Sequence, residues 1–251
     1  MTLSEELVFE GSFLFKHRSN LPLIILVIGL IVYIQTILNI EEGAPGYIVP
    51  RYYQYICLGV SFFGLLIRIY TVGHTPKNTS GRNTSEGQVA EVLNKTGIYS
   101  IVRHPLYIGN FFMWLGVSML TMNVWFIISF ILLYWLYYER IMFVEEKFLG
   151  KKFGAVYAEW AKNVPACIPS FKNFKKPNES FSWKKILKNE KNGLFAIFVV
   201  FFLFEVTGEY ITYNTFFEKG WLLYPTLASA LLYFILKFLK HKTNVLKEEG
   251  R

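Results

Sequence analysis

The sequence predicts an all-α fold, a polytopic membrane bundle of about six transmembrane helices that includes a helical hairpin. Of the 251 residues, 53% are hydrophobic and 18% aromatic, and the apolar residues come in long blocks. The mean hydropathy is +0.33. This composition excludes a disordered chain and an ordinary soluble domain, and the two cysteines are too few for a disulfide-rich secreted scaffold.

Long apolar blocks set the number of crossings, because a helix needs about 20 mostly apolar residues to span a bilayer. The first two blocks, Leu21 to Ile40 and Tyr52 to Val72, have this length. The block from Leu106 to Phe143 is too long for one crossing. It is interrupted by Thr121-Met122-Asn123, which predicts two short helices joined by a tight turn. Two further blocks bring the total to six: Leu194 to Ile211 and Trp221 to Phe238.

The positive charges predict the orientation in the membrane. With both chain ends in the cytoplasm, the inner segments are 1–20, 73–105, 139–192 and 237–251. These segments hold 23 of the 26 Lys and Arg residues, as the positive-inside rule requires. The net charge of +8 therefore reflects cytoplasmic lysines and not nucleic-acid binding. We expect an integral protein of a bacterial inner membrane with both termini cytoplasmic.

Two inner segments, 73–107 and 139–170, are richer in polar residues than the topology requires, and they flank the predicted hairpin. Tyr107 lies 16 residues before Asn123, and Arg140 lies 17 residues after it. Equal distances from the turn of an antiparallel hairpin mean equal depth. We therefore expect the run from Arg103 to Tyr107 to meet Arg140 and the pair Glu145-Glu146 at the inner membrane surface.

Each of these polar groups has two interpretations. Pro105 suits the first turn of a helix, which places Arg103 and His104 at a helix N-terminus, where free N–H groups favour an anion. The alternative is that these two side chains only contact lipid headgroups. Glu145 and Glu146 either face a pocket or begin a solvated amphipathic helix.

Two linked motifs resemble a known family. They are GIYSIVRHPLYIGNFFMWLG and, after the hairpin, ERIMFVEEKFLGKKFGAVYAEWAKNVPACIPSF. This pair, between about Arg68 and Phe171, resembles the isoprenylcysteine carboxyl methyltransferases, a group of integral-membrane methyltransferases that includes phospholipid methyltransferases. An isolated Arg-His-Pro would be a weak signal, but two motifs in this order across a hairpin are specific.

The resemblance implies a site for S-adenosylmethionine (SAM) between the hairpin and the cytoplasmic segment after it. By matching position, the implied cofactor-binding residues are Gly97, Tyr99, His104, Tyr107, Glu145 and Glu146. Arg140, and also Arg103, would address an anionic methyl acceptor. No metal is implied, and no Gly-x-Gly-x-x-Gly run follows a strand, so a soluble Rossmann-type SAM domain is not expected.

The apolar blocks and the resemblance together predict one membrane domain, residues 1–251, with three parts. Residues 1–72 would form N-terminal transmembrane helices and 73–171 the methyltransferase core. Residues 172–251 would form an interfacial helix, near Phe181 to Lys188, and two C-terminal transmembrane helices. Glu205 and Glu209 lie one turn apart on the first of these, and we expect a structural role for Glu205.

The acceptor is expected to be a membrane lipid or a lipidated molecule with an anionic oxygen, a phosphate or a carboxylate. The loop from His74 to Asn83 carries Lys, Arg, hydroxyl and amide groups that could hold a phosphate, which favours a phosphorylated lipid. The resemblance implies a lipid A-type phosphate, because some bacterial members of the family methylate one. Two other readings stay open: an NADPH-dependent membrane sterol or enone reductase, which carries a similar Arg-His-Pro-x-Tyr segment, and a non-catalytic transporter or membrane partner.

Overall fold

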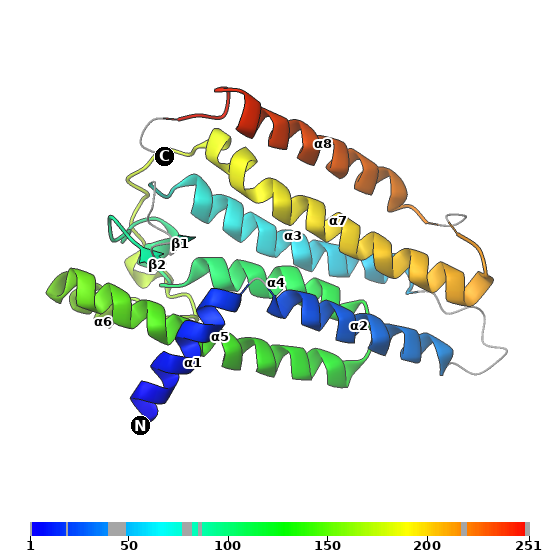
Figure 1. Ribbon diagram of the computed structural model, residues 1–251, viewed down its shortest axis with the longest axis horizontal. Helices are drawn as coiled ribbons and strands as arrows, with labels where there is room; N and C mark the ends of the chain where they lie inside the picture. Colours follow the sequence, from blue (N-terminus) through cyan, green and yellow to red (C-terminus); the bar gives the residue numbers. More distant parts are fainter. Residues whose placement is uncertain are drawn as a thin grey trace.

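The computed structural model describes residues 2–18, 20–39, 49–76, 82–84, 87–216 and 220–248. Over these residues the regular structure is α-helical apart from two short 3-10 turns and one hairpin of β1 (Arg82–Thr84) and β2 (Gly87–Val89). The α-helices are α1 (Leu3–His17), α2 (Leu21–Leu38), α3 (Arg51–Gly73), α4 (Pro105–Met119), α5 (Val124–Phe153), α6 (Ala155–Asn163), α7 (Trp183–Tyr213) and α8 (Leu223–Lys242). The long helices lie side by side as a bundle (Figure 1), which confirms the predicted fold class.

The predicted helical hairpin is formed by α4 and α5. Between them, Met122 adopts a left-handed backbone with φ of 52°, and this reverses the chain. The side chain of Asn123 accepts a hydrogen bond of 2.9 Å from the N–H of Phe126 and so caps the start of α5. The predicted turn is confirmed.

Fewer helices than the predicted six are long enough to cross a bilayer. Four of the described helices, α3, α5, α7 and α8, have the necessary length and apolarity, and a fifth span results if α1 and α2, bent by 76°, count as one. With 15 residues, α4 is only about 22 Å long. The predicted interfacial helix is also not separate, because its residues form the first turns of α7.

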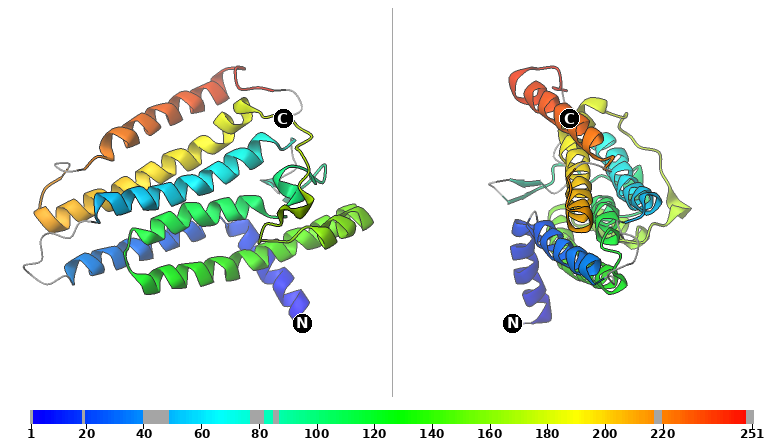
Figure 2. Two further views of the ribbon diagram at one scale, coloured as in Figure 1. Left: turned by 180° about the vertical axis from the view of Figure 1, so that it is seen from behind. Right: turned by 90° about the vertical axis from the view of Figure 1, so that its right-hand side faces the viewer.

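The two described ends of the chain lie at the same end of the bundle, here called the inner end. The β-hairpin and α6 lie there too, and α1 projects away from the bundle (Figures 1 and 2). The turn between α4 and α5 lies at the opposite, outer end. The lysine-rich segments therefore share one end of the molecule, as their charges predicted.

Glycine brings α3 and α4 into direct contact. A Cβ atom on Gly64 would lie 2.3 Å from the backbone oxygen of Gly109, and one on Gly116 would lie 2.3 Å from the backbone oxygen of Cys57. The hydroxyl of Ser61 also donates a 2.8 Å hydrogen bond to the carbonyl of Met113. Small residues commonly permit such close backbone approach between membrane helices.

Glu205 has a structural position at the outer end of α7. Its carboxylate accepts the backbone N–H groups of Trp221, at 3.3 Å, and Leu222, at 3.0 Å. Both donors immediately precede α8, and Leu222 is its N-cap residue, so Glu205 caps this helix from a neighbouring one.

We expect Glu205→Gln to weaken this cap, because an amide offers one acceptor oxygen instead of two. The expected loss is about 1–2 kcal/mol of stability, or a few degrees of melting temperature in detergent. Ligand binding at the inner end should be unchanged. An unaltered melting temperature would contradict the capping role.

Candidate active site

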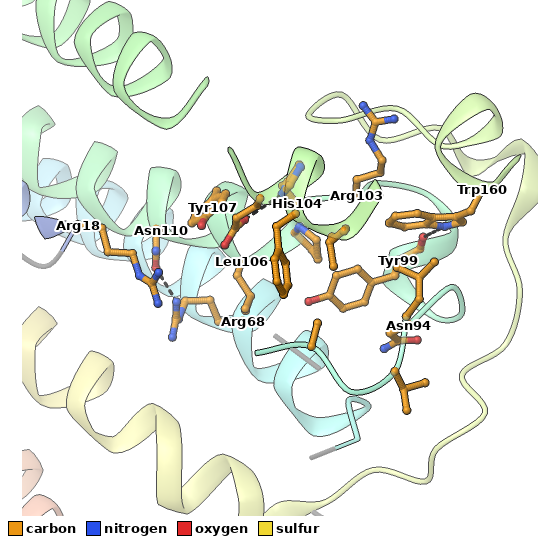
Figure 3. A pocket seen from close by; sticks show the side chains of 17 residues that line it. Arg18, Arg68, Asn94, Tyr99, Arg103, His104, Leu106, Tyr107, Asn110 and Trp160 are labelled. Carbon is orange, nitrogen blue, oxygen red and sulfur yellow. Dashed lines mark hydrogen bonds and ion pairs between the residues drawn. The ribbon is translucent and has the colours of Figure 1, made fainter. Parts of the chain in front are cut away.

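A cavity of about 280 Å³ lies at the inner end, beside the start of α4. It collects side chains from distant parts of the chain: Arg18, Arg68, Ala90, Val92, Leu93, Asn94, Tyr99, Arg103, His104, Pro105, Leu106, Tyr107, Asn110, Glu145, Phe148, Leu149 and Trp160. Figure 3 shows Arg18, Arg68 and Asn110 at one end and Tyr99, Asn94 and Trp160 at the other. One end is thus cationic and the other aromatic and polar.

The Arg-His-Pro motif meets the two glutamates across the hairpin. His104 Nε2 lies 2.9 Å from Glu146 Oε1, and His104 Nδ1 lies 3.6 Å from Glu145 Oε2. Arg103 Nε forms an ion pair of 3.0 Å with the same oxygen of Glu146. The equal depth inferred from the spacing is confirmed for these four side chains. Glu146 contacts Arg103 and His104 and does not line the cavity, whereas Glu145 faces it.

The backbone at the start of α4 is already hydrogen-bonded. The N–H of Arg103 donates to the carbonyl of Pro165 at 2.9 Å, and the N–H of His104 donates to that of Ala166 at 3.2 Å. The guanidinium of Arg103 also donates to the carbonyl of Ala161 at 2.8 Å. The N–H groups of Arg103 and His104 are therefore not available to an anion. The chain after α6 occupies them and holds the motif in place.

Tyr99 is held at the aromatic end by its neighbours. The indole N–H of Trp160 donates to the Tyr99 carbonyl at 3.1 Å. Two residues earlier, Gly97 has φ of +61°, and its N–H donates to the carbonyl of Lys175 at 2.9 Å. Burial raises the pKa of the Tyr99 phenol, so this hydroxyl stays protonated at neutral pH.

Two arginines form the cationic end. Arg68, near the end of α3, donates to both oxygens of Glu190 at 2.8 and 2.9 Å and to Asn110 Oδ1 at 2.6 Å. Arg18 follows α1, and its guanidinium carbon lies 4.0 Å from the ring centre of Phe15. Two guanidinium groups at one end of a partly buried cavity are suited to bind a carboxylate or a phosphate.

The predicted site residues fall into two groups. Five line the cavity: Tyr99, Arg103, His104, Tyr107 and Glu145. The other three do not line it. Gly97 shapes the backbone before Tyr99, and Glu146 acts on His104 and Arg103. Arg140 lies on the α1 side, where its Nε pairs with Glu10 at 2.7 Å.

Sequence reasoning missed five polar or aromatic residues of the cavity: Arg18, Arg68, Asn94, Asn110 and Trp160. For two of them, the sequence contains a feature that could have predicted a role in the site. Arg68 is the one charged residue in the apolar block from Tyr52 to Val72, and charged residues in such blocks are functional candidates by default. Asn110 follows Tyr107 by three residues and so lies on the same helix face. Across the described ranges, no group of three or more His, Cys, Asp or Glu side chains could hold a metal ion.

Comparison with known proteins supports the resemblance over the centre of the chain. Residues 54–156 match the family described as phospholipid methyltransferase. Protein-S-isoprenylcysteine O-methyltransferase of Saccharomyces cerevisiae is 34% identical over 103 residues, which are 41% of this chain and 42% of that protein. The protein of the same name from Schizosaccharomyces pombe is 34% identical over 118 residues, 47% of this chain and 50% of that protein.

The human protein of that name is 31% identical over 91 residues, 36% of this chain and 32% of that protein. The chain thus matches half or less of the length of these relatives. No solved structure matches. The matched segment covers the hairpin and most of the cavity, whereas Arg18, Trp160 and Glu190 lie outside it.

Proposed function

We propose that this protein transfers a methyl group from SAM to an anionic oxygen of a membrane-embedded lipid or lipidated acceptor, in the first place a carboxylate. The observation that carries the proposal is the cavity at the inner end, built largely by the segment that matches a methyltransferase family. The relatives are named as O-methyltransferases of isoprenylcysteine, which favours a carboxylate acceptor over a phosphate or an amine.

The residues of the cavity fit the chemistry of SAM. The cofactor carries a sulfonium cation, an ammonium group, a carboxylate and an aromatic base. The cavity offers the carboxylate of Glu145, the rings of Tyr99, Tyr107 and Trp160, and guanidinium groups. When bound, SAM supplies an activated methyl group on its sulfonium centre.

The chain's own residues would hold and orient this cofactor. Tyrosine ring faces attract a sulfonium by cation–π interaction, on the order of 0.5–2 kcal/mol. Tyr107 stacks on His104 with ring centres 5.8 Å apart, so these two rings support each other. Glu145 would accept hydrogen bonds from the amino or ribose groups, and His104, fixed by Glu146, would bind the carboxylate. Methyl transfer is an in-line displacement, which depends mainly on such alignment and on exclusion of water.

The acceptor would enter at the cationic end. Asn110 lies farther along α4 than His104, so the end with Arg18 and Arg68 is the part of the cavity that lies deeper in the bundle. An anionic oxygen that arrives already ionised needs no strong general base. Arg18 would neutralise it. Arg68, whose charge Glu190 already offsets, would help to orient it with its remaining N–H groups.

The two arginines predicted from the resemblance have different positions. Arg103 lines the cavity and can reach a ligand there. Arg140 pairs with Glu10 outside the cavity, and its predicted contact with the acceptor stays a prediction that an Arg140→Ala variant would test.

A lipid A-type phosphate is the alternative acceptor. The basis for it was the loop from His74 to Asn83, of which residues 77–81 lie outside the described part of the chain.

We place the cavity on the cytoplasmic side of the membrane, following the lysine distribution. The expected bacterial inner membrane gains no support from the relatives named above, which are eukaryotic.

Calorimetry with the purified full chain in detergent tests the proposal directly. We expect SAM to bind and NADPH not to bind. With deuterated SAM, N-acetyl-S-farnesylcysteine should gain a labelled methyl ester detectable by mass spectrometry, and a lipid phosphate should not. Binding of NADPH without SAM would favour the reductase, and label on the phosphate lipid alone would replace the carboxylate by a phosphate.

A further inference from the structure

Glu190 is a buried carboxylate on α7, outside the segment that matches the methyltransferase family. Only 3% of the residue is exposed. It accepts hydrogen bonds from Nε and Nη2 of Arg68 in the two-pronged geometry typical of Arg–carboxylate pairs. Asn110 accepts from Nη1. The pair thus joins α7 to the wall of the cavity.

We infer that Glu190 is a positioning residue for the methyl acceptor, and this inference rests on the proposed function. Its carboxylate holds the Arg68 guanidinium at the cationic end, where an anionic oxygen of the acceptor would bind. The α7 helix is then part of the site, although it lies beyond the matched segment.

The aliphatic part of the Arg68 side chain is confined as well as its guanidinium group. A Cβ atom on Gly109 would lie 2.6 Å from Arg68 Cγ, so the side chain runs directly over this glycine of α4. On α7, a Cβ atom on Gly193 would lie 3.5 Å from the side chain of Leu65 on α3 and 3.2 Å from that of Met113 on α4. These contacts place α7 close to both α3 and α4. The position of the guanidinium is therefore set from three helices.

Without Glu190, a second carboxylate would compete for Arg68. Glu145 faces the same cavity. A guanidinium that has lost its buried partner is drawn to the nearest negative charge, because an unpaired buried charge is costly. An Arg68–Glu145 contact would occupy the groups proposed for the acceptor and for the cofactor together. Glu190 keeps these two ligand positions separate.

A double-mutant cycle tests the inference on the full chain. The variants are Glu190→Gln, Arg68→Ala and the double variant, with Glu190→Asp as the conservative change. We expect Glu190→Gln to raise the KM for N-acetyl-S-farnesylcysteine at least tenfold, with a smaller change in kcat. It should also weaken SAM binding in calorimetry severalfold, and Glu190→Asp should recover most of both. The double variant should be no worse than Arg68→Ala, since Glu190 acts through Arg68.

Glu205→Gln is the matched control, because Glu205 is a buried carboxylate on the same helix that caps α8 at the outer end. It should lower the melting temperature and leave KM unchanged. Two results would overturn the inference if the wild type is active. One is that the effects of Glu190→Gln and Arg68→Ala on KM add up in the double variant, and the other is that Glu205→Gln raises KM as much as Glu190→Gln does. A wild type that neither binds SAM nor methylates the acceptor would refute the proposed function itself, and the inference with it.

Discussion

Glu145→Gln is expected to weaken SAM binding by about 10- to 100-fold. Glu145 is the carboxylate that faces the cavity, and its side chain is only 14% exposed. A hydrogen bond to a charged group contributes about 1.5–3 kcal/mol, and 1.4 kcal/mol corresponds to a factor of ten. The amide has nearly the same shape, so the loss reports the charge and not a cavity. Calorimetric titration of the purified variant with SAM measures the effect.

The neighbouring Glu146 provides the comparison for this prediction. Its carboxylate contacts His104 and Arg103 instead of the cavity. We expect Glu146→Gln to weaken SAM binding less than Glu145→Gln, because it acts only by loosening those two side chains. If Glu146→Gln had the larger effect, or if neither variant changed the affinity, the assignment of Glu145 as the cofactor-facing carboxylate would be wrong.

The sequence was sufficient to predict the helical hairpin and the meeting of Arg103 and His104 with Glu145 and Glu146 at its inner end. The break at Thr121-Met122-Asn123 located the turn, and counting residues from it placed His104 level with Glu146. Both inferences need only helix geometry and chain connectivity, which are local. They predict how deep a residue lies, and the contacts of Arg103 and His104 with Glu145 and Glu146 confirm that depth for these four residues.

Depth does not determine which way a side chain points around the helix axis. Arg140 is at a level close to the site, but its guanidinium turns to Glu10 on α1. Arg18 and Glu190 could not be assigned for a related reason, since the packing of α1 and α7 against the hairpin is not encoded in any spacing. The α3–α4 contact is a third case, because no residue count shows which glycine meets which backbone.

Gly64→Ala is expected to disrupt the bundle strongly, although it adds only one methyl group. The added methyl group would lie 2.3 Å from the carbonyl oxygen of Gly109 and 2.6 Å from the backbone nitrogen of Met113. Neither atom can move without moving α4, so the two helices must separate. Overpacking of this kind costs about 1–3 kcal/mol and occasionally more. A lower melting temperature in detergent, or failure to fold, is the expected result.

Gly59→Ala on the same helix is the matched control, because a Cβ there meets no atom within 4 Å. It should be neutral or slightly stabilising, as alanine favours a helix more than glycine does.

The two variants also differ in their expected effect on the site. Arg68 follows Gly64 by one turn of α3, and Gly109 lies between Tyr107 and Asn110 on α4. Separating α3 from α4 therefore widens the cavity at its cationic end. We expect SAM affinity and methyl transfer to fall in the folded fraction of Gly64→Ala and to stay at the wild-type level in Gly59→Ala. Equal activity per folded molecule in the two variants would show that the helix contact stabilises the bundle without shaping the cavity.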